Sequence, residues 1–433
     1  MKKTKIIATL GPATFAREKI KDLLISGINV VRINMSHEIS DSLLQDVIKW
    51  VRNEARDLGT SVAILFDICG PKIRVGRLPD ASIDVKEGNT YTLGYTDCDI
   101  SINMPLSFAS LYLDGNVKVD DGNISFQIKH LDDQKLTLVA ENSGKILQGK
   151  GINFPGTKLN LPSVTEKDKS DLEKAVKFDA DWIAMSFVRS ASDFTLISQT
   201  LQNLNATIPI IAKIEKPEAI EELDQIINTF DGILVARGDL GVEMSIEQLP
   251  ILQKKIVNKC LQNNKPVIIA TQMMDSMMHN PQPTRAEVND IANAIYDGVD
   301  AVMLSGETAI GKYPIESINM MNSIAESVEK DFDSLNFSRY IHKHTMDRND
   351  NRSSICHAAM TISNQMDVKG IVIMTNSGTT ALKMAQYRPN ATIFAISPHL
   401  KICQKLSLIW GIIAIHVNQY KYTDDMISKA TTI

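Results

Sequence analysis

The 433-residue chain has few cysteines, no long apolar run and no excess of basic charge. Its five cysteines are scattered without a C-x-x-C pair, which argues against a zinc site or a disulfide framework and predicts reduced thiols. A net charge of −5 offers no attraction for nucleic acid or an anionic membrane. The apolar run after the basic start is too short for a signal peptide, and no later run could span a bilayer. We therefore expect a cytoplasmic protein that binds neither nucleic acid nor membrane.

Hydrophobic residues make up 44% and charged residues 22%, as in a globular protein, and the length suggests about three domains. Eight short apolar runs rich in β-branched residues alternate with segments of helical spacing, such as Glu218–Asn228, each expected to form one helix. Such runs suit strands buried on both faces of a parallel sheet. Eight units predict a closed (β/α)₈ TIM barrel, with an open doubly wound sheet as the alternative. The predicted strands are Thr4–Leu10, Ile28–Asn34, Val62–Asp67, Trp182–Phe187, Pro209–Ile214, Asp231–Ala236, Pro266–Thr271 and Asp300–Ser305.

The regular spacing breaks once, after the third predicted strand. Residues 72–155 alternate apolar and polar positions around DDG and DD turns, which predicts hairpins of a small antiparallel β-barrel. A domain inserted in a βα loop lies over the carboxyl end of a barrel, where barrel enzymes have their active sites. We therefore expect a lid over a catalytic barrel made of residues 1–71 and 156–336.

A third unit follows a polar linker, residues 337–349. Residues 350–433 alternate predicted helices and strands, which indicates a C-terminal α/β domain. The last strand is expected near Gly411–Val417, with only the start of a helix after it. We therefore expect this domain to be incomplete and to lack its last strands.

Charged residues stand at the carboxyl ends of five of the eight predicted strands. Lys213 and Glu215 are two positions apart and so point the same way from a strand. Glu215 and Asp239 could form the two-carboxylate site that Mg²⁺ uses, although an ion pair between Lys213 and Glu215 is a simpler reading. Arg32, Lys213 and Arg74 around one metal indicate a phosphorylated, strongly anionic substrate. These residues leave open both a phosphotransferase and a metal-dependent aldolase or lyase.

Several motifs give the chain a family resemblance along nearly its full length. They are TKIIATLGPAT, NVVRINMSH, GPKIR, KGINFPG, TEKDK, AKIEKPEAI, ARGDLGVE and the stretch of some fifty residues from KPVIIATQMMDS to SGETAIGKYP. In this order they resemble the pyruvate kinase family, a glycolytic family. The resemblance implies a barrel, an inserted β lid and a C-terminal α/β domain. It also implies phosphoryl transfer between phosphoenolpyruvate and ADP, giving pyruvate and ATP.

The resemblance also implies roles for single residues. Lys213 would stabilise the transferring phosphoryl group and the enolate, and Arg32 would pair with the phosphoryl group. Glu215 and Asp239 would hold Mg²⁺ or Mn²⁺. The substrate carboxylate would meet the N–H groups of Gly238 and Asp239 and the hydroxyl of Thr271, which also lies on the enolate protonation route. The nucleotide phosphates would meet Asn34, His37, Arg74 and Lys150.

One departure from the family pattern concerns a monovalent cation. Many members use K⁺, held at the positions of Asn34, Ser36, Asp67 and the backbone carbonyl of Ile68, and carry DTKGPEIRT where this chain has DICGPKIRV. Members with lysine in place of that glutamate are the ones associated with K⁺ independence. This chain resembles that bacterial type. A lysine ammonium is a tethered monovalent cation, so we expect Lys72 to serve these positions and K⁺ to be dispensable.

The resemblance further implies an oligomer, a homotetramer in this family. Two alternatives to an active kinase are a metal-dependent barrel aldolase or lyase, which would not need ADP, and a truncated non-catalytic paralogue. The intact set of catalytic positions argues against the paralogue.

Overall fold

The computed structural model describes residues 2–331, 350–366 and 368–418. The predicted linker and the last residues assigned to the barrel lie outside the described residues. The expected helix after residue 418 also lies outside them, and so does the expected end of the C-terminal domain. No helix within the described ranges is long and apolar enough to cross a membrane.

The centre of the molecule is a closed barrel of eight parallel strands in the order β1-β16-β15-β14-β13-β12-β3-β2. The eight predicted units are therefore confirmed, and the open sheet is excluded. Nearly all strand residues are buried, because helices cover the outside and side chains fill the inside. The strands are β1 (Lys5–Leu10), β2 (Val30–Asn34), β3 (Ala63–Ile68), β12 (Trp182–Met185), β13 (Ile210–Ile214), β14 (Gly232–Ala236), β15 (Val267–Ala270) and β16 (Ala301–Leu304).

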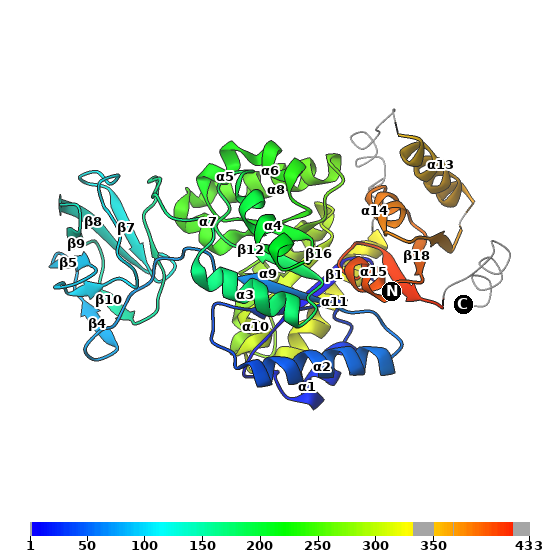
Figure 1. The fold of residues 1–433 in the computed structure, drawn as a ribbon, viewed down its shortest axis with the longest axis horizontal. Coiled ribbons are helices and arrows are strands. Elements are labelled where there is room, and N and C mark those ends of the chain that lie inside the picture. The colour runs from blue at the N-terminus through cyan, green and yellow to red at the C-terminus, as the bar shows by residue number, and fades with distance from the viewer. Residues whose placement is uncertain (1, 332–349, 367, 419–433) are drawn as a thin grey trace.

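Helices surround this barrel (Figure 1). The segment predicted as one helix over residues 218–228 is two helices, α5 and α6, that meet at Glu222. Two helices begin with capping boxes, from Thr165 and Asp168 in α3 and from Thr284 and Glu287 in α9. The helices are α1 (Arg17–Ile25), α2 (Asp41–Asp57), α3 (Glu166–Lys177), α4 (Asp193–Asn203), α5 (Pro217–Glu221), α6 (Leu223–Thr229), α7 (Arg237–Glu243), α8 (Leu249–Gln262), α9 (Arg285–Tyr296), α10 (Gly306–Ala309) and α11 (Pro314–Asp331).

The inserted segment between β3 and α3 forms its own β unit at one end of the barrel (Figure 1). A six-stranded sheet, β11-β7-β8-β9-β5-β6, accompanies a two-stranded ribbon, β10-β4, and only the β5–β6 pair is parallel. The DDG turn joins β7 to β8, with Asp120, Asp121 and Gly122 all at positive φ. The strands are β4 (Ser82–Val85), β5 (Thr90–Gly94), β6 (Ile100–Ser101), β7 (Asn116–Val119), β8 (Ile124–Leu131), β9 (Lys135–Ala140), β10 (Gly144–Leu147) and β11 (Ile152–Asn153).

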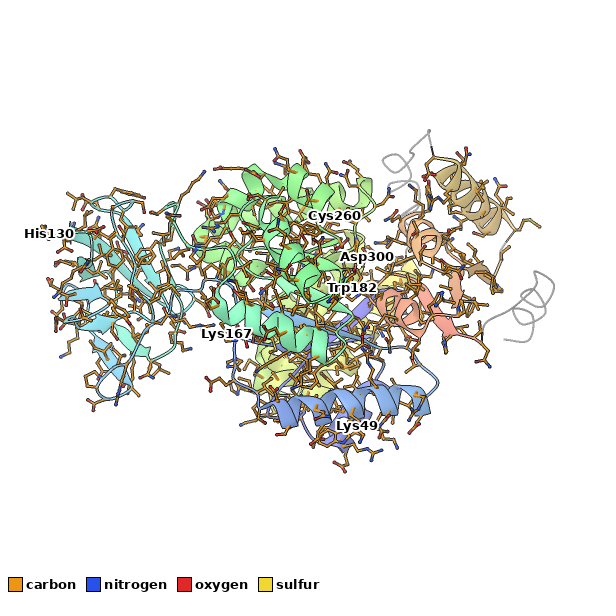
Figure 2. The ribbon with its side chains drawn as sticks, in the orientation of Figure 1. Lys49, His130, Lys167, Trp182, Cys260 and Asp300 are labelled. Carbon is orange, nitrogen blue, oxygen red and sulfur yellow. The ribbon has the colours of Figure 1, made fainter. Side chains whose placement is uncertain are left out.

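The third unit lies at the opposite end of the barrel (Figure 1). Its sheet is parallel, in the order β17-β18-β19. Asp300 and Trp182 lie on the barrel side of this junction (Figure 2), where Asp300 pairs with the buried Arg388 and Trp182 Nε1 donates to the carbonyl of Lys405. The elements are α13 (Asn351–Gln365), β17 (Gly370–Met374), α14 (Thr379–Gln386), β18 (Thr392–Ser397), α15 (Leu400–Leu406) and β19 (Ile412–His416).

Candidate active site

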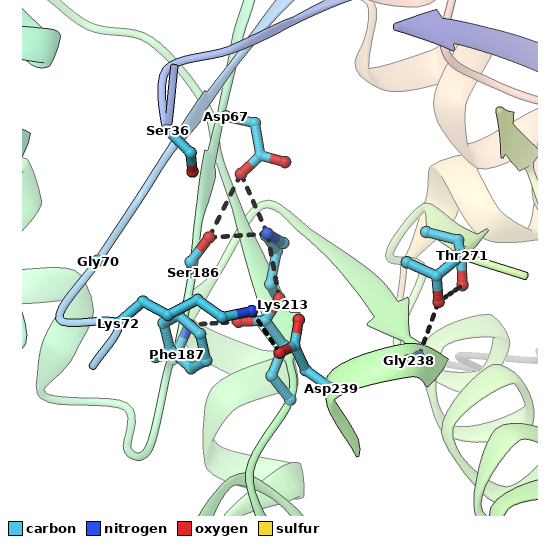
Figure 3. Close-up of polar contacts among 12 residues, drawn as sticks. Ser36, Asp67, Gly70, Lys72, Ser186, Phe187, Lys213, Gly238, Asp239 and Thr271 are labelled. Atoms are coloured by element: carbon cyan, nitrogen blue, oxygen red, sulfur yellow. Dashed lines mark hydrogen bonds and ion pairs between the residues drawn. The ribbon is translucent and has the colours of Figure 1, made fainter. Parts of the chain in front are cut away.

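Polar side chains from neighbouring barrel strands meet around the ammonium of Lys213 (Figure 3). Lys213, on β13, donates hydrogen bonds to Ser186 Oγ at 2.7 Å and to Asp67 Oδ1 at 3.1 Å. Its Nζ also lies 3.0 Å from Glu215 Oε1. Asp67 is on β3, and Ser186 follows β12 directly. Because β3, β12 and β13 are neighbours in the barrel, residues from three strand ends meet on one cation.

The surroundings of Lys213 keep it charged. Burial would lower the pKa of Lys213, but attraction to Asp67 and Glu215 outweighs burial and raises the pKa above its ordinary value. Burial raises the pKa of Glu215, against the opposing effect of Lys213. Lys213 is therefore a fixed cation throughout the neutral range.

A second cation lies on the other side of Asp67. Arg32 Nε donates to Asp67 Oδ2 at 2.7 Å, and Arg32 Nη1 donates to Thr9 Oγ1 at 2.9 Å. Burial would raise the pKa of Asp67, but Lys213 and Arg32 together hold it below its ordinary value. Asp67 thus stays anionic and fixes both cations in place.

The two residues predicted to hold a metal, Glu215 and Asp239, are each paired with a lysine. Glu215 directly follows β13, and Asp239 lies in α7, which begins where the neighbouring strand β14 ends. Burial would raise the pKa of Asp239, but the Lys72 ammonium, 2.7 Å from its Oδ1, together with Lys213 and Lys216 outweighs burial and lowers it. No group of three or more His, Cys, Asp or Glu side chains suited to a metal occurs in the described part of the chain. Two carboxylates fit Mg²⁺, which completes its shell with water and substrate oxygens.

Thr271 lies beside the start of α7. Thr271 Oγ1 accepts a hydrogen bond from the N–H of Gly238 at 2.8 Å and donates one to the carbonyl of Ala270 at 2.6 Å. Its φ is +69°, a conformation that a β-branched residue rarely adopts, so the backbone is strained where β15 ends. The structure thus brings together Gly238 and Thr271, two of the residues predicted to meet the substrate carboxylate.

The residues predicted to bind nucleotide are divided between the barrel and the lid. Asn34 ends β2, and His37 is exposed on the turn that follows. Arg74 Nη1 donates to the carbonyl of Gly149 at 3.0 Å, and Lys150 Nζ pairs with Asp120 at 2.7 Å. These contacts of Arg74 and Lys150 are with the lid itself, so the structure does not bring them into the network around Lys213.

The positions that hold K⁺ in much of the family are engaged by other groups. Ser36 N–H donates to Asn34 Oδ1 at 3.1 Å. Asp67 is paired with cations, and the carbonyl of Ile68 accepts from Ser186 Oγ at 2.7 Å. Among the contacts of these described residues, Lys72 bonds to none of the four. Its ammonium instead lies on Asp239 and 5.6 Å from the centre of the Phe187 ring.

Three residues of the site were not predicted from the sequence. Ser186 contacts Asp67, the Ile68 carbonyl and Lys213, and the N–H of Phe187 donates to Glu215 Oε2 at 2.7 Å. Ser186 is a polar residue at the end of the fourth barrel strand, and this position was the signal in the sequence that could have identified it. Asp168, known only as a helix cap, also accepts from the N–H of Gly70 at 2.9 Å.

These contacts define a class of protein. A closed (β/α)₈ barrel carries buried, paired cations and carboxylates at its carboxyl end, with an inserted domain hinged beside them. Such a site suits a small, strongly anionic ligand together with a divalent cation.

Comparison with known proteins identifies the family within this class. The family model "Pyruvate kinase, barrel domain" matches residues 1–318, and "Pyruvate kinase, alpha/beta domain" matches residues 353–433. Pyruvate kinases of Geobacillus stearothermophilus and Staphylococcus aureus (strain MRSA252) are each 39% identical over 439 residues, which covers 99% of this chain and 74% of theirs. The crystal structure of a pyruvate kinase from Cryptosporidium parvum superposes with a TM-score of 0.92 at 33% identity, over 100% of this chain and 90% of that one. The chain belongs to the pyruvate kinase family, a family of phosphotransferases.

Proposed function

We propose that this enzyme transfers the phosphoryl group of phosphoenolpyruvate to ADP through the residues around Lys213. The observation that carries this proposal is the Lys213 ammonium, held by Asp67, Ser186 and Glu215 at the end of a barrel strand. A preorganised cation stabilises negative charge that grows in the transition state without having to reorient. Lys213 would act on the transferring phosphoryl oxygens and on the enolate oxygen that is left behind.

Arg32 and the start of α7 would hold the two anionic ends of the substrate. Arg32 would bind the phosphoryl group, since Asp67 already fixes its guanidinium. The N–H groups of Gly238 and Asp239 and the hydroxyl of Thr271 would bind the carboxylate. The bond between Gly238 and Thr271 would have to open for this. Thr271 would also stand on the route by which a proton reaches the enolate.

Glu215 and Asp239 would hold Mg²⁺ or Mn²⁺, which when bound supplies a Lewis acid and a template for phosphate and enolate oxygens. The two carboxylates fit this role because both are largely buried and follow neighbouring barrel strands, β13 and β14. Asn34, His37, Arg74 and Lys150 would bind the nucleotide phosphates once the lid residues approach the barrel. We also propose a homotetramer, which sedimentation velocity would test.

Lys72 is proposed to replace the monovalent cation that many relatives use. Its flexible four-carbon stem could carry the ammonium from Asp239 toward the bound phosphoryl group. We expect Lys72→Glu to lower the rate in potassium-free buffer and KCl to restore it. The control is NaCl at the same ionic strength. Full activity of the variant without KCl would contradict this role.

The reaction itself is tested by ATP formation from phosphoenolpyruvate and ADP with Mg²⁺, in potassium-free buffer and then with KCl at matched ionic strength. Equal activity in both would support the reaction and the role of Lys72. Activity only with KCl would keep the reaction and overturn that role. Conversion of phosphoenolpyruvate without ADP would favour the aldolase or lyase alternative instead.

A further inference from the structure

Lys72 contacts one of the two proposed metal ligands directly. Its Nζ lies 2.7 Å from Asp239 Oδ1, and the two side chains are only 17% and 20% exposed. The lysine stem lies against the lid, because a Cβ added at Gly151 would come within 2.9 Å of Lys72 Cε. This ion pair is therefore well shielded from water and built into the junction of lid and barrel.

The junction has a consistent pattern. Three polar contacts join the inserted segment to α7: Lys72 to Asp239, Lys118 Nζ to the carbonyl of Val242 at 3.2 Å, and Asn153 Nδ2 to Glu243 Oε1 at 2.7 Å. Lys72 follows Gly70, whose φ of +65° marks the turn by which the chain leaves the barrel. Thus Lys72 docks the lid on the same short helix that carries Asp239.

A divalent ion held by Asp239 would share this carboxylate with the Lys72 ammonium, which already lies on Oδ1. The two cations would also repel each other across a distance at which partly buried charges interact strongly. Metal binding must therefore compete with Lys72.

We propose that Lys72 is a metal-displaced counterion, which holds Asp239 until a divalent ion binds and gives up this contact when the ion is bound. The displaced ammonium becomes available to the substrate only at that moment. This last step rests on the proposed function, whereas the displacement itself does not. By linkage, a lysine that opposes the metal must also be opposed by it to the same degree.

The test is a titration with Mn²⁺ in the absence of substrate and nucleotide. Binding is measured from the electron paramagnetic resonance signal of the Mn²⁺ that stays free. We expect Lys72→Met to bind Mn²⁺ at least about fivefold more tightly than the parent protein, within the usual range of coupling between sites. Lys118→Met is the matched control, since it removes another lysine contact to α7 without touching Asp239. It should change the dissociation constant less than about twofold. Lys72→Gln serves as a second variant if the methionine disturbs folding, as judged by circular dichroism.

A double-mutant cycle tests whether the effect runs through Asp239. In an Asp239→Asn background, Lys72→Met should no longer tighten Mn²⁺ binding. Tightening that persists there, or unchanged or weaker binding by the single variant, would overturn the proposal. Assays of ATP formation on the parent protein separate the two hypotheses. An active parent without tightening in the Lys72→Met variant overturns only the displacement, and tightening in that variant with an inactive parent overturns only the proposed reaction.

Discussion

Two lysines at opposite ends of the barrel have opposite electrostatic surroundings. Lys213 lies among carboxylates at the carboxyl end, and its pKa is raised above the ordinary value. Lys5 begins β1 at the other end, where its Nζ donates to the carbonyl of Ile412 at 2.6 Å. Burial lowers the pKa of Lys5 to about 7, and nearby Lys2 adds to this, against weaker attraction from Glu329 and Asp300.

The difference shows that burial alone does not decide whether a lysine is charged. Both side chains are largely removed from water, but only Lys213 has carboxylates in direct contact. The Ile412 carbonyl accepts a hydrogen bond from Lys5 but carries no full negative charge. It therefore does not offset the free energy that is lost when a charged ammonium is removed from water. The carboxyl end therefore keeps its lysine charged, whereas the junction with the C-terminal domain favours the uncharged amine of Lys5.

The largest effect is expected from the charged end. Lys213→Met should lower kcat for ATP formation by about 10³-fold, because it removes a preorganised charge from the transition state. Lys213→Arg keeps the charge and protects the fold but places it differently, so a large loss is expected there too. Steady-state kinetics would measure both. Lys254→Met, which removes a surface ion pair with Asp297, is the control. Near-normal kcat in both Lys213 variants would show that the reaction does not need the charge of Lys213.

The next effect concerns Lys5 and pH. Unfolded Lys5 has an ordinary pKa of 10.5, above its folded value of about 7. Between these values the unfolded chain binds more protons, so stability must rise with pH. From pH 7 to 9 we expect Lys5 to contribute about 2 kcal/mol to the rise in the free energy of unfolding. Denaturant titrations at several pH values would measure the free energy of unfolding of the parent and of Lys5→Met. We expect this free energy to rise more steeply with pH in the parent than in the variant. Parallel pH profiles would mean that Lys5 is not held uncharged.

The smallest effect concerns how Lys213 is positioned. Ser186→Ala removes one acceptor from the Lys213 ammonium but leaves both carboxylates. A net hydrogen bond to a charged group contributes about 1.5 kcal/mol, so we expect kcat to fall about tenfold. The KM for ADP should not change, which separates positioning of Lys213 from general damage. Ser190→Ala, on the exposed pair with Ser192, is the matched control. A changed KM for ADP with normal kcat would contradict a positioning role.

Much of the fold could be predicted from the sequence because its signals are local. Eight apolar runs predicted eight barrel strands, and the segments of helical spacing between them predicted helices. The break between α5 and α6 was missed, since no glycine or internal proline marks Glu222. The site was predicted less completely, because Ser186 acts through contacts with residues more than a hundred positions away in Asp67 and Ile68.

The sequence by itself therefore determined the barrel, the inserted domain and which charged residues stand at the ends of strands, because strand and helix periodicity and turn chemistry are read along the chain. Only the tertiary structure decided the partners of those charges. Lys72 lies on Asp239 and not on Asp67, which Arg32 and Lys213 already occupy. Pairing depends on distances between strands and across the lid junction, and those distances exist only once the barrel has closed.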